Sequence, residues 1–181
     1  MSPWNLVIHI VPGAPETGLF ECLSDLGRVH RAEHEGVFLL YAEDPVAALR
    51  QLRLLRRMNP AVDRAIERIV PLTETFTFAS QAELAARVNR YIQQWRPRLD
   101  GKSVHLDPAQ DTTAPACPDA ATLADILGNL LARAGLRDDP DPDLYLTFDC
   151  CGDWAGLSLW SRALCRRYPE LGLDNADTAP A

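Results

Sequence analysis

The sequence predicts an α+β protein made of two successive units. Three observations predict it: the order of the hydrophobic patterns, the prolines and glycines that separate them, and the size of the chain. Short segments with the two-residue period of strands are interleaved with longer segments of helical period. With 181 residues, 47% of them hydrophobic, the chain can bury one large core or two small ones.

The first half predicts the element order β-α-β-β-α-β. Its segments are strand 4–11, helix 17–26, strands 28–34 and 35–43, helix 45–59 and strand 66–72. Pro12-Gly13 and Gly27 end the first strand and the first helix, because both residue types interrupt regular structure. Asp44 before Pro45 is an N-cap followed by proline at the first helical position, which predicts the start of the second helix. This order is the ferredoxin-like arrangement.

The second half continues from the segment "RIVPLTETFTF", residues 68–78, which closes the first unit and leads into the second. Ser80 and Glu83 form a capping box before a helix that we expect to run to Arg96 and to stop at Pro97. Its apolar face, which we expect to pack on a sheet, comprises Leu84, Val88, Ile92 and Trp95. The remaining segments are strand 102–107, helix 122–134, and strands 144–150 and 154–160 joined at Gly152-Asp153.

These segments divide the chain into an N-terminal unit of residues 1–67, a second unit of residues 68–167, and a polar C-terminal tail of residues 168–181 that we expect to be flexible. No apolar run approaches the roughly 20 residues of a membrane span, and the N-terminus lacks the features of a signal peptide. We therefore expect a cytoplasmic protein without membrane contact. Its cysteines, odd in number, are expected to be reduced and mostly packed. Oxidation of the adjacent Cys150 and Cys151, or binding of a soft metal by them, is the less favoured alternative, because neighbouring residues of a strand point to opposite faces.

Enzymatic signatures are lacking in the sequence. It contains no phosphate-binding glycine loop, nucleophile elbow or zinc-protease motif, so we expect no catalytic residues, cofactor or metal. His9 and His105 lie inside apolar strands, where a hydrogen-bonded structural histidine is expected. The aspartates at 138, 139, 141 and 143 lack the glycine and terminal glutamate of a calcium loop, and a solvated connector is the better interpretation.

Arginines give the clearest chemical signal, although the formal net charge is −7. Arg50, Arg53 and Arg57 recur at helical spacing with Arg56 beside them, opposite the leucines of the predicted helix 45–59. The planar guanidinium group binds phosphate oxygens bidentately, so such a face suits a nucleic-acid backbone. The ordinary solvated side of an amphipathic helix produces the same pattern.

Four stretches of the second half have a characteristic order: "ERIVPLTETFTFASQAELAARVNRYI", "GKSVHLD", "ATLADILGNLLARAG" and "DLYLTFDCCGDWAGLSLW". Through them, residues 66–165 resemble the THUMP family of tRNA-modification systems. The first half resembles the ferredoxin-like domain that precedes THUMP, and "EGVFLLYAEDPVAALRQLR" is similar to a segment of stand-alone THUMP adaptors of tRNA cytidine acetylation. One departure is that the strand after the first THUMP helix carries His105 and Asp107 where arginines are common, and an acid at this position is expected to repel RNA phosphates.

The resemblance implies a non-catalytic RNA-binding adaptor that holds the acceptor end of tRNA and presents it to a separate modifying enzyme. The expected RNA-binding residues are Arg50, Arg53, Arg56 and Arg57 in the first unit and Arg87, Arg90 and Lys102 in the second. The alternative is a protein-interaction module of the same fold that has lost RNA binding, which the acidic net charge favours.

Overall fold

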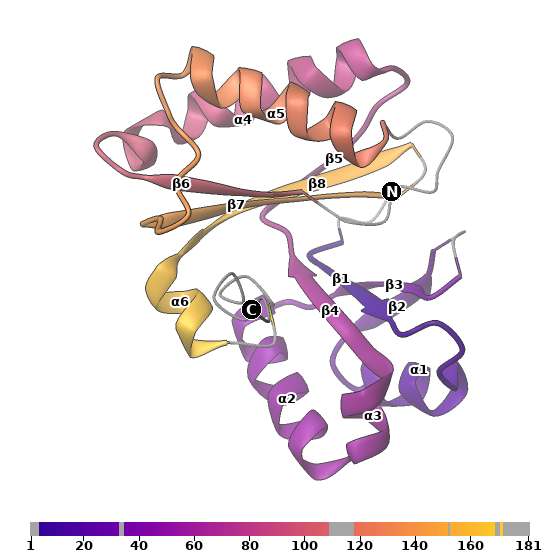
Figure 1. The fold of residues 1–181 in the computed structure, drawn as a ribbon. Coiled ribbons are helices and arrows are strands. Elements are labelled where there is room, and N and C mark those ends of the chain that lie inside the picture. The colour runs from indigo at the N-terminus through magenta and orange to yellow at the C-terminus, as the bar shows by residue number, and fades with distance from the viewer. Residues whose placement is uncertain (1–3, 33–34, 109–117, 152, 169–170, 172–181) are drawn as a thin grey trace, which may run out of the picture.

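The computed structural model describes residues 4–32, 35–108, 118–151, 153–168 and 171. The described residues form two four-stranded sheets. Figure 1 shows helices on the outer side of each sheet. The elements are β1 (Leu6–Ile10), α1 (Glu16–Ser24), β2 (Arg28–Arg31), β3 (Val37–Tyr41), α2 (Pro45–Met58), α3 (Pro60–Ala65), β4 (Ile66–Pro71), β5 (Glu74–Thr77), α4 (Gln81–Leu99), β6 (Val104–Pro108), α5 (Ala120–Arg133), β7 (Leu144–Cys151), β8 (Trp154–Ser161) and α6 (Arg162–Arg167). This is the α+β architecture that the sequence predicts.

The first sheet has the strand order β2-β3-β1-β4, and all of its neighbouring strands are antiparallel. Its strands and helices follow the order expected for the first half, with α3 as an addition that begins at the Asn59 cap. One face of β1 packs through Leu6 and Ile8 against the helices, and the other face, which includes Val7 and His9, turns toward the second sheet. The first sheet is therefore covered on both faces.

The second sheet has the strand order β5-β8-β7-β6, in which β6 and β7 are parallel and the other pairs are antiparallel. Helices α4 and α5 cover its outer face (Figure 1). The residues expected on the buried face of α4 are all in the core: Leu84, Val88, Ile92 and Trp95, joined by Leu99. The expected stop of this helix at Pro97 is wrong, because a proline in the last turn removes only one of the hydrogen bonds that hold it.

The chain passes from the first sheet to the second within residues 71–74. β4 pairs with β1 as far as Pro71, and β5 pairs with β8 from Glu74 onward. The segment "RIVPLTETFTF" therefore contributes strands to two different sheets. Residue 68, the first residue of the predicted second unit, lies inside β4 of the first sheet.

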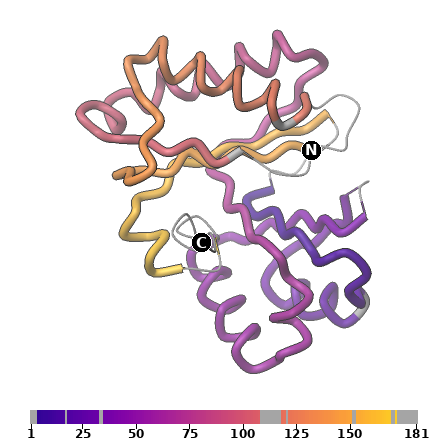
Figure 2. Tube along the Cα trace, viewed as in Figure 1, coloured from indigo at the N-terminus to yellow at the C-terminus, as the bar shows by residue number. Residues whose placement is uncertain are grey.

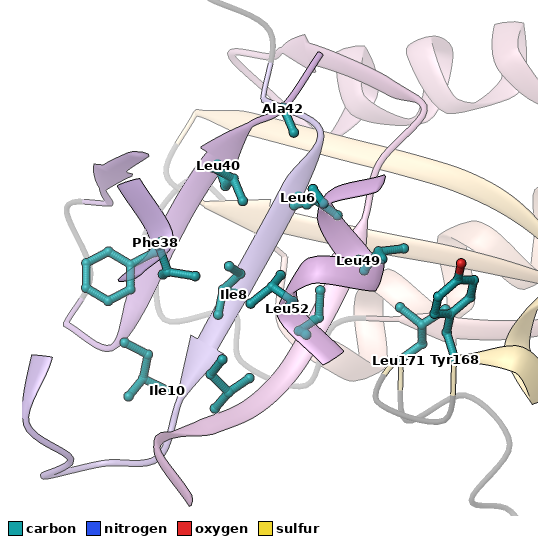
Figure 3. Close-up of a cluster of buried hydrophobic side chains, with 14 of the residues drawn as sticks. Leu6, Ile8, Ile10, Phe38, Leu40, Ala42, Leu49, Leu52, Tyr168 and Leu171 are labelled. Carbon is teal, nitrogen blue, oxygen red and sulfur yellow. The ribbon is translucent and has the colours of Figure 1, made fainter. Parts of the chain in front are cut away.

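The C-terminal segment returns to the first unit after β8. Figure 2 shows this yellow segment running from the second sheet back toward α2. Tyr168 and Leu171 are fully buried in the same hydrophobic cluster as Leu49 and Leu52, as Figure 3 shows. The prediction of a flexible tail is wrong for these two residues, because they extend an apolar stripe that packs on a core distant in sequence. Residues 172–181 lie outside the described part of the chain.

The inner face of the second sheet packs against the first unit. Tyr145 and Trp160 belong to the first hydrophobic cluster, and Trp154 packs with Val7 and Val70. The two units therefore share buried surface in addition to their separate cores. Among the described residues, no helix combines the length and hydropathy needed to cross a membrane.

Among the cysteines whose side chains the structure describes, Cys22 and Cys165 are reduced, as expected, whereas Cys150 is disulfide-bonded. The preferred expectation is therefore wrong for Cys150, where the oxidised alternative holds. Cys117 and the side chain of Cys151 lie outside the described part of the structure.

Candidate nucleic-acid interface

Helix α2 is fixed at its start by a side-chain cap and along its length by burial of one face. The Oδ1 atom of Asp44 accepts hydrogen bonds from the backbone N–H groups of Val46 and Ala47, both at 2.9 Å, and Pro45 occupies the first turn. Ala48, Leu49 and Leu52 are buried against the first sheet. Because residues three and four apart share a helix face, this burial directs Arg50, Arg53 and Arg57 outward.

The end of α6 lies beside this arginine face. The Nε atom of Arg50 donates a hydrogen bond to the hydroxyl of Tyr168 at 3.2 Å. The Nη1 atom of Arg53 donates one to the backbone carbonyl of Arg167 at 2.9 Å. The contact with Tyr168 raises the pKa of Arg50 above its ordinary value, so its guanidinium remains charged. Both acceptors are uncharged, and the two arginines keep their positive charge uncompensated at these contacts.

Helix α6 adds arginines of its own. Arg166 and Arg167 occupy its last turn and are exposed, and the guanidinium of Arg167 lies 5.9 Å from the ring centre of Tyr168. We call the outward-facing cations of the two helices the α2–α6 basic surface; its members are Arg50, Arg57, Arg166 and Arg167, which are exposed, and Arg53, which is half-buried. Within the described part of the chain, Arg50, Arg53 and Arg57 form no salt bridge with a carboxylate. Their charge is available to an external anion.

Arg56 does not lie with its neighbours. Its Nε atom contacts Oδ1 of Asp63 on α3 at 2.7 Å, and only 21% of its side chain is exposed. The sequence grouped it with Arg57 because the two are adjacent, but adjacent residues of a helix point about 100° apart. Arg56 therefore connects α2 to α3 and is not part of the α2–α6 basic surface.

The candidates of the second unit lie elsewhere. Arg87 pairs with Glu83 at 3.3 Å within α4, while Arg90 and Lys102 are exposed. Figure 1 places α4 on the side of the second sheet away from α2. The structure therefore does not join Arg87, Arg90 and Lys102 to the basic surface on α2 and α6.

Asp107, expected to repel RNA, is instead half of a salt bridge with Arg68 across the two sheets. Its side chain is only 23% exposed. Burial raises the pKa of Asp107 above its ordinary value, and the positive charge of Arg68 opposes this rise. Since the carboxylate is mostly covered and faces an arginine, the expectation that it repels an RNA backbone is wrong.

A second ionisable pair lies beside the first, since His9 and Arg68 are register partners in β1 and β4. Nε2 of His9 contacts Oδ2 of Asp149 at 2.7 Å, and Asp149 is 1% exposed. His9 is therefore hydrogen-bonded, as expected, and so is His105, whose Nδ1 lies 2.9 Å from Oδ1 of Asp138. That the two histidines have a structural role stays a prediction.

The acidic connector of residues 138–143 is engaged by neighbouring groups of the fold. Asp138 accepts the backbone N–H of Leu106, Asp143 accepts from Ser103, and Asp141 forms a salt bridge with Arg162. Within the described residues, no cluster of three or more histidine, cysteine, aspartate or glutamate side chains has the arrangement of a metal site.

Arg166, Arg167 and Tyr168 are not among the predicted site residues. The two arginines stand at the end of the predicted second unit, apart from the arginine pattern of residues 50–57, and Tyr168 falls in the predicted tail. The sequence does contain a pattern that indicates packing of this segment. Leu164, Tyr168 and Leu171 recur at i, i+4 and i+7, the spacing of a buried helical stripe, and all three belong to or contact the first hydrophobic cluster. A stripe of this kind indicates that the segment packs, and the arginines between its members then point outward.

Comparison with known proteins identifies the fold. No family model and no curated protein matches the sequence. Among solved structures, the chain is similar to PH1313 from Pyrococcus horikoshii Ot3, with a TM-score of 0.58 and 11% identity over 87% of this chain and 54% of that one. It is also similar to TrmN from Thermus thermophilus, with a TM-score of 0.54 and 20% identity over 91% of this chain and 48% of that one.

The chain thus spans about half the length of these two proteins. A third likeness, with a TM-score of 0.47 and 13% identity over 88% of this chain and 42% of that one, is to a 4-thiouridine synthetase solved as an RNA complex with bound ATP. At such identities a likeness concerns the fold alone, and the first two support the conclusion that the chain has a THUMP-like α+β fold.

Proposed function

We propose that the protein binds tRNA through the α2–α6 basic surface and serves as a non-catalytic adaptor that presents the acceptor end to a separate modifying enzyme. The observation that carries the proposal is the set of arginines with uncharged partners. Arg50 and Arg53 are held by a hydroxyl and a carbonyl oxygen, which fix their positions without cancelling their charge. The THUMP-like fold and the sequence resemblance to tRNA adaptors support the choice of tRNA as the ligand.

The guanidinium groups of Arg50 and Arg53 are better suited to contact RNA phosphates than RNA bases. A guanidinium group has five N–H donors, and one hydrogen bond to Tyr168 or to the Arg167 carbonyl leaves the others available. These donors can engage phosphate oxygens in pairs, a contact that positions the RNA without reading its sequence. We therefore expect affinity for tRNAs of different sequence, with any selectivity for the acceptor end arising from its shape.

A titration of the purified protein against an unmodified tRNA transcript tests this function. Fluorescence anisotropy at several salt concentrations between about 50 and 200 mM should show an affinity that falls with salt, with a log-log slope of about −2 to −4 if three or four phosphates are contacted. If the protein is a non-catalytic adaptor, it should also leave the tRNA chemically unchanged when it is incubated with the tRNA alone. Mass spectrometry of the digested RNA detects any modified nucleoside. Absence of salt-dependent binding at the lowest concentration contradicts the proposal.

A protein-interaction module is the second candidate, and one observation favours it. Leu54 and Met58 are 57% and 83% exposed, and they lie one turn apart on the outer side of α2. Exposed large apolar side chains of this kind occur at protein–protein contacts. If the tRNA titration fails, this face of α2 is where a partner protein should be sought.

A further inference from the structure

The C-terminal segment reaches the basic surface from the other unit of the molecule. It leaves β8 of the second sheet, forms α6 with Ser161 as its cap, and ends in Tyr168. The ring of Tyr168 is buried in the core of the first unit, and the residue is only 1% exposed. A side chain anchored in this way has little freedom, so its hydroxyl occupies a defined position.

The Tyr168 hydroxyl accepts a hydrogen bond from Arg50, whose side chain forms no other hydrogen bond or salt bridge among the described residues. The Nε atom of Arg50 donates to it at 3.2 Å over a sequence separation of 118 residues. One turn along α2, Arg53 is held by the carbonyl of Arg167 at 2.9 Å. Two adjacent guanidinium groups are therefore held by two consecutive residues of the returning segment.

Such anchoring affects binding because arginine side chains are flexible in water. An exposed arginine loses rotamer freedom when it binds a phosphate, and this loss opposes association. A guanidinium already held through Nε has lost part of that freedom in the free protein. Its two Nη groups, which form the outer edge of the fork, remain available for phosphate oxygens.

We propose that Tyr168 is a positioning residue that orders Arg50 for phosphate binding, so that the basic surface is complete only when the end of the second unit is seated on α2. The inference rests on the proposed function, because it concerns the same surface. It adds that tRNA affinity depends on a side chain that does not itself touch the RNA. It also explains why an apolar stripe and a pair of arginines occur together in the segment 162–171.

The Tyr168→Phe variant tests the proposal, because it removes the hydroxyl and keeps the buried ring. In the free protein, the Nε–Hε NMR signal of Arg50 should show restricted motion in the wild type and free rotation in the variant. Affinity for a tRNA transcript should fall by about three- to tenfold, the range of one lost hydrogen bond. Tyr91→Phe is the matched control, since the Tyr91 hydroxyl makes no hydrogen bond within the described residues and its ring stacks on Phe76; it should bind like the wild type.

A second pair of variants separates positioning from stability. In an Arg50→Gln background, Tyr168→Phe should cause no further loss of affinity, because the arginine that it orders is gone. Equal losses in both backgrounds, or an Arg50 signal that is the same with and without the hydroxyl, would overturn the role of Tyr168 while leaving the tRNA function intact. Failure of the wild type itself to bind tRNA would overturn the proposed function, and this inference with it.

Discussion

Arginines occupy two regions of this molecule in opposite electrostatic settings. Between the sheets, Arg68 faces the carboxylate of Asp107, and the neighbouring His9 faces that of Asp149. On the α2–α6 basic surface, Arg50 and Arg53 face a hydroxyl and a carbonyl oxygen. In the first arrangement, carboxylates pair with basic side chains that are mostly buried between the sheets. The second holds positive charge in place where an anion can reach it.

The difference distinguishes arginines that join parts of the fold from arginines whose charge stays available to a ligand. A carboxylate partner on a neighbouring element indicates that the arginine joins parts of the fold, as Arg68 does between the sheets and Arg56 does between α2 and α3. A neutral partner fixes the side chain without satisfying its charge, and the remaining attraction is left for a ligand. A formal net charge of −7 is therefore compatible with a local site for a polyanion.

The largest effect is expected at the contact between the sheets. Asp149→Ala leaves His9 without its carboxylate in a buried place, and removal of one member of a buried pair costs about 3 to 5 kcal/mol in unfolding free energy. Urea denaturation at neutral pH measures it. Asp149→Asn, which keeps a hydrogen-bond acceptor, should lose less. A loss below about 1 kcal/mol for the alanine variant would show that this pair does not hold the sheets together.

A smaller, pH-dependent effect is expected at Asp107. Burial raises its pKa above the ordinary value, so the folded protein holds a proton that the unfolded chain releases. Stability from this group is thus greatest below the unfolded pKa of about 3.9 and is lost as pH rises through the raised value. Relative to Asp107→Asn, the wild type should lose unfolding free energy as pH rises from about 4, measured by urea midpoints across this range. A relative gain would mean that Arg68 outweighs burial.

The smallest effect on stability is expected on the basic surface. Arg57→Gln should change the unfolding free energy by no more than about 0.5 kcal/mol, because the side chain is exposed. It should also reduce the salt slope of tRNA binding by about 1. The matched Arg68→Gln variant should show the reverse pattern, with an unfolding loss of about 1 to 3 kcal/mol and an unchanged salt slope. Thermal unfolding and the anisotropy titration measure the two properties side by side.

Local patterns were sufficient for most of the fold. The Asp44-Pro45 signal marks the start of α2, and the capping box at Ser80 and Glu83 marks that of α4, with Glu83 accepting the N–H of Ala79 in return. The apolar stripe of α4 packs on the second sheet as its period indicates. These features depend on residues within a few positions of one another, which is why the sequence reveals them.

The site was predicted only in part, because its partners are distant in sequence. Helical spacing places Arg50, Arg53 and Arg57 on one face, but it cannot show that Arg56 meets Asp63 of a separate helix. The contact of Arg50 with Tyr168 spans 118 residues, and that of His9 with Asp149 spans 140. The pairing of Asp107 could not be predicted either, because its partner, Arg68, belongs to the other sheet.

The most direct test of the central claim compares tRNA affinity in two charge-matched variants. One reverses Arg50, Arg53 and Arg57 to glutamate, and the other reverses Arg87, Arg90 and Lys102, so both change the net charge equally. At low salt, the first should weaken binding by at least about tenfold and lower the salt slope by about 2 to 3, while the second should change affinity much less. Circular dichroism and thermal unfolding confirm that both fold. Equal losses, or a larger loss for the second variant, would contradict the assignment of RNA binding to α2 and α6.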